Sequence, residues 1–89
     1  MTDKVVIITG GSRGIGRATA IAAAARGFRV CIGYVSNEAA ARSVVSAIEA
    51  KNGKAIAVKC DVGIERDILA LFEAADGFGT TAFAFAANR

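Results

Sequence analysis

The feature that most constrains the fold is a glycine-rich stretch lying between two segments of contrasting pattern. Residues 9–16 read Thr-Gly-Gly-Ser-Arg-Gly-Ile-Gly. A short β-branched apolar segment, 5–8, precedes it, and an alanine-rich segment, 17–26, follows it without glycine or proline. Strand, glycine turn and helix in this order are typical of a phosphate-binding site, because the turn must be tight and the backbone must approach the anion closely. The following helix would direct free N–H groups and its positive dipole end at that anion.

Several residues of this stretch have an expected role. Three of its four glycines would supply the turn, the close approach of a pyrophosphate and the close packing of helix on sheet, in the order Gly10, Gly14 and Gly16. Ser12 and Arg13 lie on the crest of the loop, where a hydroxyl and a guanidinium are placed to reach the adenosine ribose or its phosphate. A solvated loop arginine is the alternative for Arg13. Ile15 is expected to pack beneath the cofactor with its N–H towards the phosphates.

The rest of the chain alternates between strand and helix patterns. Strands are predicted over 4–9, 29–34 and 54–60, and residues 80–89 form a candidate fourth strand. Helices are predicted over 14–26, from an N-cap at Ser36 or Asn37 to about Lys51, and over roughly 65–76. Glycine-containing stops follow them at Gly27, Asn52-Gly53, and Gly77 with Gly79. The expected apolar faces of the three helices are Ile15, Ala18, Ala22 and Ala25; Ala41, Val44, Val45 and Ile48; and Ile68, Leu71, Phe72 and Ala75.

This alternation predicts an α/β fold with a parallel sheet and helices on both of its faces. We expect a Rossmann-type doubly wound sheet that is incomplete, a β-α-β-α-β-α-β half with strand order 3-2-1-4. No linker or repeat divides the chain, so residues 1–89 are interpreted as the dinucleotide-binding half of a single domain.

The end of the second predicted strand bears on the choice of cofactor. Folds that select NAD place a carboxylate about 20 residues beyond the glycine loop. Here that position is Tyr34, and the nearest acid, Glu38, is interpreted as belonging to the first turn of the next helix. Ser36 and Asn37 are left as possible donors to a 2′-phosphate. The pattern therefore favours NADP over NAD, since a carboxylate that would repel the phosphate is missing.

The string TGGSRGIGRATA closely resembles the cofactor loop of the short-chain dehydrogenase/reductase family, and the resemblance covers residue 5 to about 79. It implies the N-terminal, cofactor-binding part of an NAD(P)-dependent oxidoreductase that interconverts an alcohol and a carbonyl. In this family an arginine at the position of Arg13 often accompanies NADP use. The resemblance also implies that Asp61 holds the adenine amino group and that the backbone N–H of Val62 contacts the ring. A turn aspartate is the alternative for Asp61.

The catalytic groups of that family are not among these 89 residues. Its serine and its Tyr-x-x-x-Lys pair are expected further along, and the sole tyrosine here, Tyr34, has Glu38 four residues on. Two other functions stay open: a stand-alone nucleotide-binding module, and a fragment without activity. We also expect that the 89 residues alone do not form a stable monomer, because a fourth strand with Phe83 and Phe85 would present an apolar edge that favours a homo-oligomer.

Composition argues against several other classes. The 11 basic residues are scattered, the net charge is only +3 and no run of cations forms a tract, so neither nucleic acid nor a membrane surface is expected as a partner. With no histidine, a zinc site has too few ligands. Cys31 and Cys60 are expected to be buried reduced thiols, which fits a cytoplasmic protein. The N-terminus does not have the pattern of a signal peptide.

Overall fold

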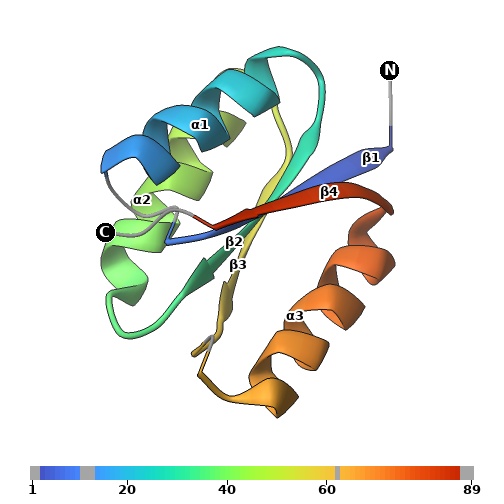
Figure 1. Ribbon diagram of the computed structural model, residues 1–89. Helices are drawn as coiled ribbons and strands as arrows, with labels where there is room; N and C mark the ends of the chain where they lie inside the picture. The colour runs from blue at the N-terminus through green and yellow to red at the C-terminus, as the bar shows by residue number, and fades with distance from the viewer. Residues whose placement is uncertain (1–2, 11–13, 62, 87–89) are drawn as a thin grey trace.

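The computed structural model describes residues 3–10, 14–61 and 63–86, the last six of them as backbone. Four strands and three helices alternate along the chain: β1 (Lys4–Thr9), α1 (Gly14–Ala25), β2 (Arg29–Tyr34), α2 (Glu38–Glu49), β3 (Ala55–Lys59), α3 (Glu65–Phe78) and β4 (Thr80–Ala86). The strands form one parallel sheet in the order β3-β2-β1-β4. In Figure 1 the sheet runs between α1 and α2 on one side and α3 on the other. The predicted α/β architecture is therefore confirmed.

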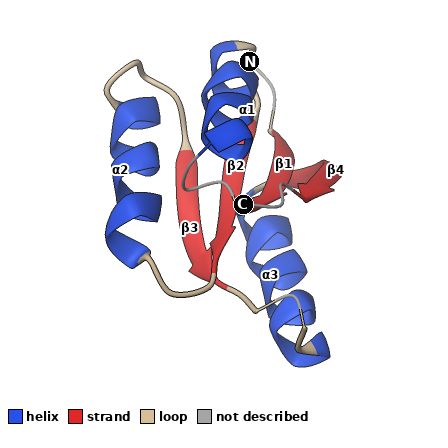
Figure 2. Ribbon diagram, turned by 60° about the vertical axis from the view of Figure 1, so that its left-hand side comes forward, coloured by secondary structure: helices blue, strands red, loops and turns tan. Residues whose placement is uncertain are grey.

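Each face of the sheet carries its own core, because successive side chains of a strand point to opposite faces. Val6 and Ile8 of β1 join Val30 and Ile32 of β2 in the core beneath α1 and α2. The residues between them face α3, and that core consists of Val5, Ile7, Cys31, Cys60, Leu71 and Ala75. Figure 2 shows the helices on both sides of the sheet. Burial on both faces explains why the strands read as continuous apolar runs rather than alternating ones.

The first two helices end at the glycine-containing stops predicted from the sequence, and backbone hydrogen bonds fix both ends. After α1, the N–H of Gly27 donates to Ala24 O at 3.0 Å and that of Phe28 to Ala23 O at 3.2 Å. This is the pattern of a Schellman cap, with Gly27 in the left-handed region at φ 94°. After α2, Asn52 takes the left-handed conformation, and Gly53 N–H donates to Ile48 O at 3.0 Å.

The predicted face of α1 is wrong. Its four members are exposed, and the buried residues of the helix are Gly16 and Ala20, with Ala23 and Ala24 half-buried beside them. These positions follow the spacing i, i+4, i+7 and i+8 of a single helix face. Because alanine stands on every side of this helix, the spacing of its apolar residues does not indicate which side packs on the sheet. The side that contains Gly16 packs there, since glycine has no side chain to hold the helix away from the sheet.

The α2 face is confirmed: Ala41, Val44 and Ile48 are buried, with Val45 packed against them. In α3, Leu71 and Ala75 are buried and Ile68 packs beside them, but Phe72 is 39% exposed. The helix also extends past Gly77 to Phe78, whose side chain packs on the same core. Gly77 was therefore wrongly predicted as a stop, whereas Gly79 follows the last helical residue.

One cation from the sheet stabilises the end of α3. Arg29 of β2 donates from Nη1 to the carbonyl oxygen of Phe78 at 2.5 Å, and its Cζ lies 5.7 Å from the centre of the Phe78 ring. The last turn of α3 has no basic residue of its own. Arg29 therefore supplies the positive charge that a helix C-terminus favours.

We expect Arg29→Met to lower the free energy of unfolding by about 2 kcal/mol, because it removes a charge-assisted hydrogen bond and a cation–π contact. The measurement is urea denaturation followed by circular dichroism. Arg26→Met is the control, since Arg26 is exposed just after α1 and should change stability by less than about 0.5 kcal/mol. Equal losses in the two variants would contradict the proposed capping role of Arg29.

Candidate functional site

The candidate site lies at the carboxyl edge of the parallel sheet. There Thr9 pairs with Gly33, and Tyr34 pairs with Lys59, so β1, β2 and β3 end side by side. From β1 the chain passes through α1 to β2, whereas from β3 it crosses the other face through α3 to β4, on the far side of β1. The carboxyl end of β1 is thus the point where the winding of the sheet reverses. In open α/β sheets, ligands bind at such a switch point.

The glycine stretch begins at this point. Gly10 follows β1, and its N–H donates to the carbonyl oxygen of Gly33 at 3.0 Å, which joins the start of the turn to β2. Gly10 and Gly14 have φ angles of 71° and 63°, in the left-handed region that favours glycine. Helix α1 begins at Gly14, and Gly16 is buried. Ser12 and Arg13 lie outside the described residues.

The ends of the helices differ in charge at this edge. The first turn of α2 contains Glu38, and that of α3 contains Glu65 and Asp67. Both placements suit the positive end of a helix dipole. The first turn of α1 has no acidic residue and includes the half-buried Arg17, a cation at an end that disfavours cations. An anion bound at this helix end would account for both features, and the residues present therefore fit a phosphate group.

Ile15 lies in the first turn of α1 with 73% of its surface exposed. The structure therefore places this side chain on the surface rather than in the core. Its expected contact with a cofactor stays a prediction.

The side chains predicted to meet the ribose lie between the end of β2 and the first turn of α2. Tyr34 is half-buried against the core beneath α1 and α2, and Ser36 and Asn37 are exposed. Asn37 Oδ1 accepts a hydrogen bond from Ala40 N–H at 3.0 Å, so Asn37 is the N-cap of α2. Glu38, in the first turn as expected, pairs with Arg42 Nε at 2.8 Å.

At the end of β3, Asp61 makes the local contacts of a turn aspartate. Its Oδ1 accepts from Gly63 N–H at 2.9 Å, and its own N–H donates to Asp67 Oδ2 at 3.1 Å. These bonds leave Oδ2 of the exposed Asp61 without an assigned role, and its contact with adenine remains a proposal. Val62 lies outside the described residues. Sequence reasoning missed Asp67, because its contact with the loop is visible only once α3 is placed.

The two thiols are buried in the core beneath α3. They are unpaired: Cys31 is the register partner of Ile56 within the sheet, whereas Cys60 follows the end of β3 and lies against Gly33. Burial, and then the neighbouring Cys60, raises the pKa of Cys31 to about 12 from an ordinary value of 9.0.

Because the pKa of Cys31 is raised in the folded protein, the free energy of unfolding is expected to fall at high pH. The unfolded thiol ionises near pH 9 while the folded one stays protonated, so the stabilisation is complete below pH 9 and is lost as pH rises towards 12. We expect the free energy of unfolding to fall by about 1 kcal/mol more between pH 9.5 and 10.5 in the native chain than in Cys31→Ala. Urea denaturation at the two pH values measures this difference. Equal slopes in the two proteins would contradict the assignment.

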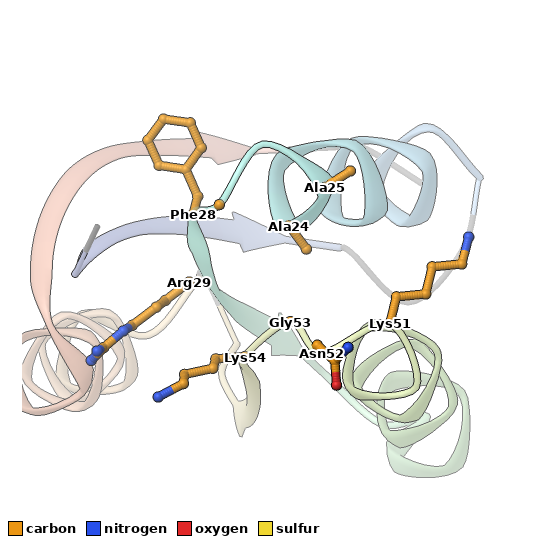
Figure 3. A pocket seen from close by; sticks show the side chains of 9 residues that line it. Ala24, Ala25, Phe28, Arg29, Lys51, Asn52, Gly53 and Lys54 are labelled. Atoms are coloured by element: carbon orange, nitrogen blue, oxygen red, sulfur yellow. The ribbon is translucent and has the colours of Figure 1, made fainter. Parts of the chain in front are cut away.

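A hollow lies at the opposite edge of the sheet. It encloses about 130 Å³ and is lined by Ala24, Ala25, Gly27, Phe28, Arg29, Lys51, Asn52, Gly53 and Lys54. Figure 3 shows Arg29 pointing out of this hollow towards α3. Small-molecule sites usually enclose 300–1,000 Å³, so a dinucleotide does not fit here. Of the cations that line it, Arg29 is engaged by the carbonyl oxygen of Phe78 at the end of α3.

Other kinds of site find no support in the part of the chain that is described. Over 3–10, 14–61 and 63–86, no group of three histidine, cysteine or acidic side chains is placed to hold a metal ion. None of the described helices is long and apolar enough to cross a membrane.

Known proteins share both the sequence and the fold. The family described as short chain dehydrogenase matches residues 4–80. An uncharacterized oxidoreductase of Escherichia coli, YgfF, is 42% identical over 72 residues, which are 81% of this chain and 29% of the relative. A 3-oxoacyl-[acyl-carrier-protein] reductase of Synechocystis is 48% identical over 62 residues, 70% of this chain and 25% of the relative.

The solved structure of a dehydrogenase/reductase from Sinorhizobium meliloti superposes with a TM-score of 0.92 at 32% identity, over 98% of this chain and 35% of that one. The chain therefore spans between a quarter and about a third of the length of these proteins. Within that span the match includes the strand, glycine turn and helix on which the candidate site is built. The chain belongs to the short chain dehydrogenase family, whose members are oxidoreductases that use a nicotinamide cofactor.

Proposed function

We propose that this chain is the dinucleotide-binding half of a single Rossmann domain, in an NAD(P)-dependent oxidoreductase that interconverts an alcohol and a carbonyl. The observation that carries the proposal is the glycine turn at the switch point, followed by a helix whose first turn lacks a carboxylate and contains Arg17. The reductase name of the Synechocystis relative supports the reaction class. A bound nicotinamide supplies or accepts the hydride of such a reaction.

The residues of this chain would bind and orient the cofactor. Backbone N–H groups at the start of α1, with Gly10, Gly14, Ile15 and Gly16, would hold the pyrophosphate. Ser12, Arg13, Tyr34, Ser36 and Asn37 would surround the adenosine ribose, and Asp61 with Val62 would meet the adenine. The substrate is a small-molecule carbonyl or alcohol. Proton transfer to its oxygen would fall to the family's serine and Tyr-x-x-x-Lys, outside these 89 residues.

As part of the same proposal, the protein is cytoplasmic and homo-oligomeric. The two buried unpaired thiols support the first point. The second rests on β4, which is the outermost strand beside β1. The edge of β4 that faces away from β1 could pair with another strand, either from a second subunit or from a longer form of this chain.

We propose NADP as the preferred cofactor, because Tyr34 stands where an NAD-selecting carboxylate would be and Glu38 is paired with Arg42. Tyr34→Asp is then expected to weaken NADP binding about tenfold, through repulsion of the 2′-phosphate, and to change NAD binding by less than twofold. Isothermal titration with both cofactors measures the two affinities, with Tyr34→Asn as the uncharged control.

The titrations are made on the 89-residue chain and on a chimera in which it replaces the matching segment of the Sinorhizobium meliloti protein. The chimera supplies the remainder of the domain. A native protein that binds NAD more tightly than NADP would contradict the proposed preference, and a protein that binds neither would contradict the proposed function.

A further inference from the structure

Lys59 is the last residue of β3, beside the end of β2. It is the register partner of Tyr34, and the N–H of the next residue, Cys60, donates to Tyr34 O at 2.7 Å. The pairing of the two strands therefore continues to the carboxyl edge of the sheet. Neighbouring strands lie about 4.8 Å apart, so the side chains of Lys59 and Tyr34 begin close together.

Both side chains lie on the face covered by α2. Ile32 and Tyr34 of β2, and Ala57 of β3, pack in the core beneath α1 and α2. Lys59 follows Ala57 by two residues, so strand alternation directs it to the same face. Helix α2 begins on that face with its N-cap Asn37. Lys59 is exposed, and within the described residues no ion pair engages its ammonium group.

The polar groups around this position favour an anion. Asn37 uses Oδ1 to cap α2, which leaves its amide N–H groups to donate outwards. Ser36 adds an exposed hydroxyl. Of the acids at this edge, Glu38 is engaged by Arg42 at 2.8 Å, and Asp61, two residues beyond Lys59, accepts from Gly63 N–H at 2.9 Å. A dianionic group bound between the ends of β2 and β3 would meet two neutral donors, Ser36 and Asn37, and the ammonium group of Lys59.

We propose that Lys59 is a specificity-determining residue that binds the 2′-phosphate of the dinucleotide together with Ser36 and Asn37. The inference rests on the proposed function, since it assumes that the adenosine end of the cofactor lies at the ends of β2 and β3. It adds a residue from β3, which spacing along the sequence does not connect with the end of β2. NADP and NAD differ only in this phosphate, so Lys59 would distinguish one from the other.

The test uses 2′,5′-ADP and 5′-ADP, which differ in the same phosphate and need no nicotinamide site. Lys59→Gln is expected to weaken binding of 2′,5′-ADP five- to tenfold and to change binding of 5′-ADP by less than twofold. Lys59→Arg should restore most of the loss. Lys54→Gln is the matched control, because Lys54 is exposed just before β3, at the opposite edge of the sheet. Isothermal titration is made on the 89-residue chain and on the chimera described above.

The outcomes separate the two proposals. Unchanged 2′,5′-ADP binding in Lys59→Gln, or an equal loss in Lys54→Gln, overturns the role of Lys59 and leaves the proposed function standing. Equal affinity of the native protein for both nucleotides also overturns it. If the native protein binds neither nucleotide in either form, the proposed function itself fails.

Discussion

Replacing Gly14 with valine is expected to lower the affinity for NADP at least 100-fold. Gly14 begins α1 with φ at 63°, a conformation that β-branched residues rarely adopt. The substitution would displace the first N–H groups of the helix and place a side chain where the proposed pyrophosphate approaches. Fluorescence titration with NADPH, on the chain and on the chimera, measures the loss.

Gly27→Val is the matched control for this prediction. Gly27 lies beyond the other end of α1 with φ at 94°, and a Cβ there would meet no atom within 4 Å. The two variants therefore share backbone strain of about 1–3 kcal/mol, whereas only one of them changes the proposed site. We expect Gly27→Val to bind NADPH within twofold of the native protein wherever it is folded. Equal losses of affinity would show that strain, rather than the site, explains the effect of Gly14→Val.

The second large effect is expected at Gly79, between α3 and β4. A Cβ here would overlap the carbonyl oxygen of Asp3 and lie 2.9 Å from Val5 Cγ2. The backbone cannot move away easily, because Thr80 N–H donates to that same Asp3 oxygen at 2.9 Å and starts the pairing of β4 with β1. Gly79→Ala is therefore expected to lower the free energy of unfolding by at least about 3 kcal/mol, a large part of the stability of a small domain.

Gly77→Ala provides the opposite result two residues earlier. Gly77 is helical, and a Cβ there would meet no atom within 4 Å. Alanine should stabilise α3 by about 0.5–1 kcal/mol, through its higher helix propensity and a less flexible unfolded chain. Urea denaturation of both variants separates the two positions. A Gly79→Ala protein as stable as Gly77→Ala would contradict the close packing of β4 on the start of β1.

Most of the fold could be predicted because its signals are local. Apolar runs such as 5–8 mark the strands, and stops such as Gly27 and Asn52 form hydrogen bonds within a few residues of themselves. The face of α1 could not be predicted, because its alanines give no contrast between one side and another. Phe72 was misplaced for a related reason: its spacing from Ile68 fits a helix stripe, but the sheet covers only the neighbouring positions.

The candidate site likewise has features that could be predicted from adjacent residues and features that could not. The glycine turn, an N-cap at Ser36 or Asn37 and the missing acid at Tyr34 follow from adjacent residues, and the structure identifies Asn37 as the cap. The contact of Asp67 with the loop after β3, and the position of Lys59 beside Tyr34, depend on how separate elements are placed. Strand register is a property of the folded sheet, so spacing along the chain does not indicate these neighbours.

The central claim is that the carboxyl edge of the sheet binds the dinucleotide. Amide chemical-shift mapping by NMR, with NADP added to the ¹⁵N-labelled chain and to the labelled chimera, tests it residue by residue. We predict that the shifts concentrate at Gly10, Gly14, Gly16 and Tyr34, with Asp61 at the end of β3. Shifts concentrated around Ala24, Gly53 and Lys54, in the hollow at the opposite edge (Figure 3), would contradict the claim.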